Sequence, residues 1–167
     1  TPASKDAEAR WTIKNKHWHL GYKLHMCTDE EGFVAQINVT PANVADVNHL
    51  ETVLDNVAKG ATVFADKGYD SQYNRAFLER NQLKDGIMCK AHRAKALTRE
   101  DISRNKRLSK IRYRVEQSFA ILHRKFQCKR ASYFGVAKVK GQMLLKVMCL
   151  NLLKVANKLR LVAPIAA

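Results

Sequence analysis

Two acidic residues stand where carboxylate chemistry is possible, Asp66 and Glu116. Asp66 directly follows the short apolar stretch Thr62–Ala65, which is typical of a buried parallel strand. Ligands collect at the carboxyl edge of the strands in open α/β sheets, so an acid at this point is well placed to bind a metal or a substrate. A solvated Asp that shapes the turn before Gly68 is equally consistent with this position.

Glu116 lies in a stretch of helical periodicity and is surrounded by basic residues. Helical spacing puts Ser109, Arg112, Glu116 and His123 on one narrow face, which is expected to border the apolar stripe. An exposed Arg112–Glu116 pair four residues apart also occurs without any function and stabilises a helix by only ~0.3–0.5 kcal/mol. The basic residues nearby are Lys106, Arg107, Lys110, Arg114, Arg124 and Lys125.

The two carboxylates together make a stronger case than either alone. Mg²⁺ prefers a few carboxylates plus substrate oxygens to a complete protein cage. A pair of such ions activates the attacking oxygen and stabilises the leaving oxygen in phosphoryl transfer. The basic residues around Glu116 are then suited to bind the flanking phosphates of a nucleic acid.

Charge is distributed very unevenly along the chain. The 167 residues contain 30 Lys and Arg against 15 Asp and Glu, a formal net charge of +15. Residues 84–167 carry all of the excess, a net +17, whereas residues 1–83 carry −2. Such a surface attracts polyanions, most commonly nucleic acid. The length fits one domain over residues 1–167.

The cysteines and the hydropathy pattern exclude several classes of protein. The four cysteines form no C-x-x-C pair, which indicates free thiols in a reducing cytoplasm. His17, His19 and His25 lack the partners of a zinc pattern and are interpreted as strand residues. No apolar run reaches the ~18 residues of a membrane span, and the polar start of the chain is not a signal peptide.

The predicted elements alternate between strands and helices, which defines an α/β layer architecture without a linker. Residues before 16 show no period and are expected to form a loop. A capping box, Thr98–Asp101, opens a long helix whose core stripe is Leu108, Ile111, Val115, Phe119, Leu122 and Phe126. The strands are expected at residues 17–28, 33–40, 62–65 and 85–89, and the helices at residues 45–57, 71–81, 98–126 and 136–161.

Five segments resemble the DDE transposases of bacterial insertion sequences, of the IS-four/IS-five kind. They are Lys5–Thr12, Gly21–His25, Thr40–Asp46, Ala65–Tyr69 and Arg112–Glu116. The resemblance implies an RNase H-like mixed sheet flanked by helices, here lacking its first strand and followed by two long helices. It assigns the second catalytic Asp to Asp66 and the catalytic Glu to Glu116, both as metal ligands.

The sequence departs from the family pattern at three points. Ser109 stands where the signature around the Glu has Tyr, and His123 stands where it has Lys, with Arg124 adjacent. The strand that carries the first catalytic Asp is expected upstream of Lys5, so the chain is interpreted as the carboxyl-terminal part of a transposase. Neither Asp6, Glu8 nor Asp29 is a convincing replacement for that Asp.

The resemblance implies Mg²⁺- or Mn²⁺-dependent cleavage of DNA at the element ends and strand transfer into target DNA. It implies a two-metal site, incomplete in this chain, and therefore little or no activity of the chain alone. The expected partners are insertion-sequence ends, target DNA and further copies of the chain, in a nucleoid-associated cytoplasmic protein. Two alternatives remain open: a basic DNA-binding module without chemistry, and a structural helical protein. The expected DNA contacts are Lys67, Arg112, Arg114, His123, Arg124 and Lys125.

Overall fold

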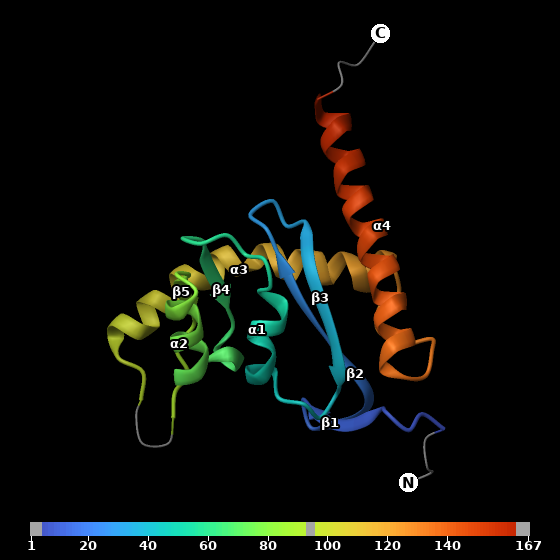
Figure 1. Cartoon of the computed structure of the whole chain (residues 1–167), viewed down its shortest axis with the longest axis horizontal. Helices are drawn as coiled ribbons and strands as arrows, with labels where there is room; N and C mark the ends of the chain where they lie inside the picture. The colour runs from blue at the N-terminus through green and yellow to red at the C-terminus, as the bar shows by residue number, and fades with distance from the viewer. Residues whose placement is uncertain (1–4, 93–95, 163–167) are drawn as a thin grey trace. The chain divides into compact units, whose positions relative to one another are not determined.

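The computed structural model describes residues 5–92 and 96–162, with the side chains described up to residue 159. The elements follow an α/β order, as expected from the sequence (Figure 1). They are β1 (Arg10–Lys14), β2 (His17–Thr28), β3 (Val34–Pro41), the 3₁₀ helix η1 (Asp46–His49), α1 (Leu50–Val53), β4 (Thr62–Ala65), the 3₁₀ helix η2 (Lys67–Tyr69), α2 (Gln72–Arg80), β5 (Lys84–Ile87), α3 (Arg99–Lys125) and α4 (Val136–Val162).

The chain divides into two compact units. The first unit combines Thr1–Asn43 with Gln117–Ala167, and the second is the continuous stretch Val44–Glu116. Helix α3 supplies residues to both units. In the described part of the chain the strands form two sheets, an antiparallel one of three strands in the first unit and a parallel one of two strands in the second.

The first unit is built around β2, which pairs with β1 along its first half and with β3 along its second. Asp29 closes the β2–β3 turn by accepting hydrogen bonds from the backbone of Glu31 and Phe33, and Gly32 supplies a positive φ of 81°. Helix α4 runs beside β3 (Figure 1), and its side chains bury the inner face of the sheet. The buried core consists of Val34, Ile37, Val39, Leu122, Val139, Met143, Val147 and Leu150.

Acidic residues near the start of the chain hold the beginning of α4. The Gly135 amide donates to Asp6 Oδ2 at 3.4 Å and to the Tyr22 hydroxyl at 3.1 Å, and the Val136 amide donates to Glu8 Oε2 at 3.0 Å. These groups satisfy amides that a helix leaves without intrahelical partners. Asp6 and Glu8 therefore have a structural role in the first unit.

The second unit centres on the parallel pair β4–β5, in which Ala65 lies opposite Ile87. Gly86 permits the close approach of the two strands, because a Cβ there would lie 2.6 Å from the Val63 carbonyl oxygen. Ser71 caps α2 by accepting from the Asn74 amide at 3.1 Å, whereas the sequence left Asp70 and Ser71 open as alternative caps. The capping box of α3 is also confirmed, since Thr98 and Asp101 exchange hydrogen bonds.

Several expectations from the sequence are wrong. Arg10–Lys14 is a strand and no loop, because it forms a hairpin with β2 through the two-residue turn Asn15–Lys16, both residues at positive φ. The stretch expected to be one helix over 45–57 is split into η1 and α1 and ends at Val53. The β4 strand is buried on one face only, since Phe64 is exposed. Ile111 is also exposed, outside the core stripe.

Further findings concern the cysteines, histidines and helices of the described residues. All four cysteines are free, and no group of three or more His, Cys, Asp or Glu residues is arranged to hold a metal ion. His17, His19 and His25 lie in β2. No helix in the described ranges is long and apolar enough to cross a membrane.

Candidate active site

The parallel strands of the second unit position Asp66. Because β4 and β5 run in the same direction, the residues after each strand, Asp66 and Met88, emerge at one edge of this sheet. The Asp66 backbone is extended, and its carboxylate accepts a 2.6 Å hydrogen bond from the Lys67 amide at the start of η2. The carboxylate is 47% exposed, which leaves it open to water or a ligand.

Helix α3 brings Arg112 to the same edge. Its Nη1 lies 3.7 Å from Asp66 Oδ1 and 3.4 Å from Met88 Sδ, and its Nη2 lies 3.3 Å from Glu116 Oε1. The Arg112 side chain is only 16% exposed, whereas Glu116 is 57% exposed. One guanidinium thus joins the carboxylates of Asp66 and Glu116, which are 50 positions apart in the sequence.

Two findings modify the sequence-based expectations for Glu116. It does not border the core but projects into solvent beside Arg112. Arg112 and Glu116 form the helix pair that their spacing of four residues predicts. Arg112 also reaches Asp66, which this spacing does not predict. The pair on the helix is therefore part of a larger arrangement that includes the strand end.

Tyr69 lies in the electrostatic field of these residues. Burial, together with the negative charges of Asp46 and Asp66, raises the pKa of Tyr69 to about 12, and the positive charge of Arg112 opposes this rise. Asp46 lies close to the same loop, since its Oδ2 is 3.8 Å from the position of a Cβ built on Gly68. The sequence analysis did not assign Tyr69 a role, and spacing alone could not show that its hydroxyl lies near these charges.

The α3 helix is fixed to β5 by side chains that precede Arg112. Asn105 makes two hydrogen bonds with Cys89, accepting from the Cys89 amide at 2.8 Å and donating to its carbonyl at 2.9 Å. Arg104 donates to the carbonyl oxygens of Ile87 at 2.6 Å and of Asp85 at 3.0 Å. These contacts determine where Arg112, two turns further along α3, meets the strand ends.

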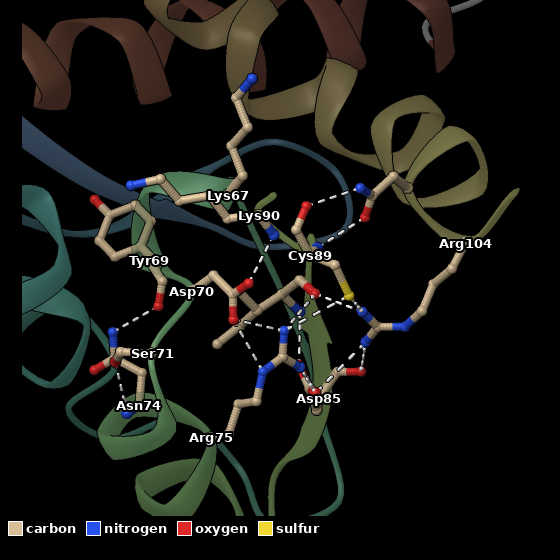
Figure 2. A network of polar contacts seen from close by, with 12 residues as sticks. Lys67, Tyr69, Asp70, Ser71, Asn74, Arg75, Asp85, Cys89, Lys90 and Arg104 are labelled. Carbon is tan, nitrogen blue, oxygen red and sulfur yellow. Dashed lines mark hydrogen bonds and ion pairs between the residues drawn. The ribbon is translucent and has the colours of Figure 1, made fainter. Parts of the chain in front are cut away.

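A second charged network lies in the same unit, around Arg75 (Figure 2). Arg75 Nε and Nη2 both donate to Asp70 Oδ1, at 3.1 and 2.9 Å, and Nη1 donates to Asp85. The other Asp70 oxygen accepts from the Lys90 amide at 2.7 Å. Burial lowers the pKa of Arg75, but the hydrogen bond that Arg75 donates to Asp70 and the negative charge of Asp85 outweigh burial and raise the pKa overall. Sequence analysis missed this network, because none of its members shares a helical or strand period.

The expected DNA contacts fall in both units. Lys67, Arg112 and Arg114 belong to the second unit together with Asp66 and Glu116, whereas His123, Arg124 and Lys125 belong to the first. Lys67, Arg114, His123, Arg124 and Lys125 are exposed, and Arg112 is engaged by the two carboxylates. Burial lowers the pKa of His123, and the positive charges of Lys129 and Lys14 lower it further.

The oxygen donors of the candidate site are of the type that divalent cations prefer. Asp66 and Glu116 offer hard carboxylate oxygens that are half exposed, which leaves room for water and for substrate oxygens around an ion. They supply two protein carboxylates, and Arg112 competes with an ion for both. An exposed strand-end carboxylate, a helix carboxylate and a guanidinium between them define a site suited to metal-assisted chemistry on phosphates.

The transposase DDE domain family matches residues 1–152, so the chain belongs to the DDE transposases. The chain is similar to the transposase for insertion sequence element IS1106 of Neisseria meningitidis serogroup B, with 54% identity over all 167 residues. It spans 57% of the length of that relative. No solved structure gives a significant match.

Proposed function

We propose that the chain forms the catalytic part of an insertion-sequence transposase, which binds DNA and transfers phosphoryl groups with the help of divalent cations. The observation that carries the proposal is the convergence of Asp66 and Glu116 on Arg112. The family implies dependence on divalent metal in general, and Mg²⁺ or Mn²⁺ at a two-metal site is the specific form that we propose. The partners are then insertion-sequence ends and target DNA, bound by a homo-oligomer in the nucleoid.

In this proposal the chain's own residues have distinct roles. Asp66 and Glu116 hold the cations, which supply charge neutralisation and an activated oxygen when bound. Arg112 pairs with both carboxylates and would contact a DNA phosphate when these carboxylates hold an ion, and Lys67 and Arg114 bind neighbouring phosphates. His123, Arg124 and Lys125 extend the phosphate contacts along α3.

The fold and the completeness of the site are part of the same proposal. We infer an RNase H-like single catalytic domain over residues 1–167, of which the two compact units are parts. Among the described residues no third acid joins Asp66 and Glu116 in a group arranged to hold a metal ion, and Asp6 and Glu8 accept hydrogen bonds at the start of α4. The chain alone is therefore expected to bind DNA but to show little or no strand transfer.

Metal binding tests the site without requiring activity. Binding of Mn²⁺ to the chain is measured by electron paramagnetic resonance, in which free Mn²⁺ gives the signal. Asp66→Asn and Glu116→Gln are each expected to weaken binding about tenfold or more, because each removes a charged ligand. Asp55→Asn, at an exposed acid of the same unit, is the control and is expected to leave binding unchanged.

Two outcomes would contradict the proposal. If the unmodified chain and both variants bind Mn²⁺ equally, the proposed metal site is wrong. This result favours a DNA-binding module without chemistry. Robust Mg²⁺-dependent strand transfer by the isolated chain, measured on a labelled duplex with an exposed 3′-hydroxyl, shows that two carboxylates suffice and that the inferred incompleteness is wrong.

A further inference from the structure

The β1–β2 hairpin carries an apolar face that nothing in the described part of the chain covers. Cross-strand pairing places Trp11 opposite Leu20 and Ile13 opposite Trp18. Directly opposed residues of an antiparallel pair lie on the same face, so these four side chains form one surface. We call it the tryptophan face; its members are between 38% and 66% exposed.

The tryptophan face continues a stripe whose other half is partly buried. Side chains two apart along a strand share a face, so Trp18 and Leu20 lie in line with Tyr22, Leu24 and Met26. The latter three pack against the core formed by β3, α3 and α4. Only β1 pairs with the first half of β2, and the hairpin therefore extends beyond the part of the sheet that the helices cover.

The two tryptophans support each other. Their ring centroids are 6.3 Å apart at an interplanar angle of 83°, an edge-to-face arrangement. The tight turn Asn15–Lys16 fixes the register that brings them together. They are also the only two tryptophans in the chain, so a large, ordered aromatic surface is exposed at the end of one hairpin.

The rest of the hairpin is basic. Residues 10–21 contain no Asp or Glu, and the face opposite the tryptophans carries Lys14 and His17 as a cross-strand pair, with Lys16 in the turn. Lys14 and Lys129 both lie within electrostatic reach of His123, so Lys14 is near a second lysine of the same unit. Protein–protein interfaces are depleted of lysine at their centres, and a second copy of such a hairpin would be repelled.

Exposed aromatic rings on one face of a ribbon, with lysines on the other face and in the turn, match the chemistry of a nucleic acid strand. Bases stack on aromatic side chains in a way that tolerates any sequence, while basic side chains follow the phosphates. A two-stranded ribbon is also narrow enough to enter a DNA groove. Bases inside a duplex are already stacked on each other, so free ring surfaces are best matched by unpaired bases.

We propose that the β1–β2 hairpin is a DNA-binding arm in which Trp11 and Trp18 stack on unpaired bases while Lys14 and Lys16 bind the adjacent phosphates. This proposal rests on the proposed function, because it requires DNA as the partner. It adds a contact that discriminates unpaired from paired DNA and lies outside the Asp66–Arg112–Glu116 site.

Intrinsic fluorescence tests the arm directly, because every tryptophan of the chain lies in it. The unmodified chain is titrated with a 15-nucleotide oligothymidine, with a duplex of the same length and with heparin, a polyanion without bases. The oligothymidine is expected to quench the fluorescence by stacking, the duplex less, and heparin hardly at all. Binding of each ligand is followed independently by fluorescence anisotropy with a labelled ligand.

Variants test the energetic contribution. Trp18→Ala is expected to weaken oligothymidine binding about tenfold and heparin binding not at all, because stacking of one base is lost. Trp18→Phe keeps an aromatic ring and is expected to retain most of the affinity, even if the Ala variant disturbs the hairpin. Tyr73→Ala, at an exposed aromatic of α2, is the control and is expected to change neither.

These experiments distinguish failure of the proposed DNA-binding arm from failure of the proposed transposase function. Salt-dependent DNA binding with equal fluorescence changes for oligothymidine and heparin overturns the arm and leaves DNA binding intact. Sedimentation of the chain as a dimer that Trp18→Ala dissociates assigns the tryptophan face to self-association and likewise overturns the arm. Failure to bind any of the three ligands at low salt contradicts the proposed function itself.

Discussion

Two arginines of the second unit each join two carboxylates, yet their surroundings differ. Arg75 donates twice to Asp70, whose side chain is 14% exposed, and also to Asp85. Arg112 makes longer contacts, of 3.3 and 3.7 Å, to the more exposed Glu116 and Asp66. The first arrangement uses up its hydrogen-bonding capacity within the protein, and the second leaves carboxylate oxygens free to bind something else.

The difference shows how ion pairs that look alike in a sequence can serve stability or function. Removing Arg75 would leave two carboxylates, one of them the mostly buried Asp70, without the donor of three hydrogen bonds, which is costly. Arg112 is itself mostly buried, but its contacts are longer and its partners Glu116 and Asp66 are about half exposed, so these ion pairs contribute little to stability. We therefore interpret Arg75 as structural and Arg112 as part of the candidate active site.

Paired alanine substitutions give the largest expected contrast. Arg75→Ala is expected to lower the free energy of unfolding by about 2–3 kcal/mol, because Asp70 and Asp85 lose their shared donor. Arg112→Ala is expected to lower it by less than about 1 kcal/mol. Urea unfolding followed by circular dichroism measures both. Equal losses in the two variants would remove the distinction between the networks.

Alkaline pH is expected to lower the stability of the protein through Tyr69, which lies near Asp66 and Arg112. The pKa of Tyr69 is raised to about 12 by burial and by the charges of Asp46 and Asp66. The contribution of the neutral Tyr69 hydroxyl to the free energy of unfolding is thus complete below pH 10 and is lost as the pH rises towards 12.

Tyr69→Phe should therefore reduce the loss of stability between pH 10 and 12 by about 1–2 kcal/mol. Urea unfolding at a series of pH values measures this loss, and Tyr113→Phe, at an exposed tyrosine, is the control. An unchanged pH profile in Tyr69→Phe would show that Tyr69 does not respond to the charges of the site.

The smallest expected effect concerns competition between Arg112 and a cation. Arg112→Ala should increase Mn²⁺ affinity about fivefold, since a positive charge about 4 Å from a carboxylate contributes about 1 kcal/mol even in water. Arg107→Ala, at an exposed arginine of the same helix, should change the affinity much less. Weaker Mn²⁺ binding in Arg112→Ala would instead mean that the guanidinium organises the ligands and does not compete with the ion.

Sequence patterns predicted most of the elements because their signals are local. The β2 strand, the caps of α2 and α3, and the long α4 helix follow from alternation, capping residues and helical periodicity. The β1 strand escaped prediction, since its partner is needed to reveal it and Asn15–Lys16 is an uncommon turn sequence without glycine.

The candidate site was predictable only in part, for the same physical reason. Asp66 was identified by its place after a strand, and Glu116 by its basic surroundings and by resemblance. The reach of Arg112 across to Asp66 depends on how α3 is fixed to β5 by Arg104 and Asn105, which no local pattern encodes. The metal-binding and DNA-binding roles of these residues stay predictions.

The hydrogen bonds that Asp6 and Glu8 accept at the start of α4 span 129 and 128 positions of the sequence. The first unit is thus assembled from both ends of the chain, with the second unit inserted between them. A ribosome adds about 5–20 residues per second from the amino terminus, so Tyr22, Leu24 and Met26 emerge long before α4 exists to cover them. The second unit is continuous in sequence and can fold as it emerges, whereas the sheet of the first unit stays uncovered until α4 is synthesised, which leaves its apolar side chains exposed for longer.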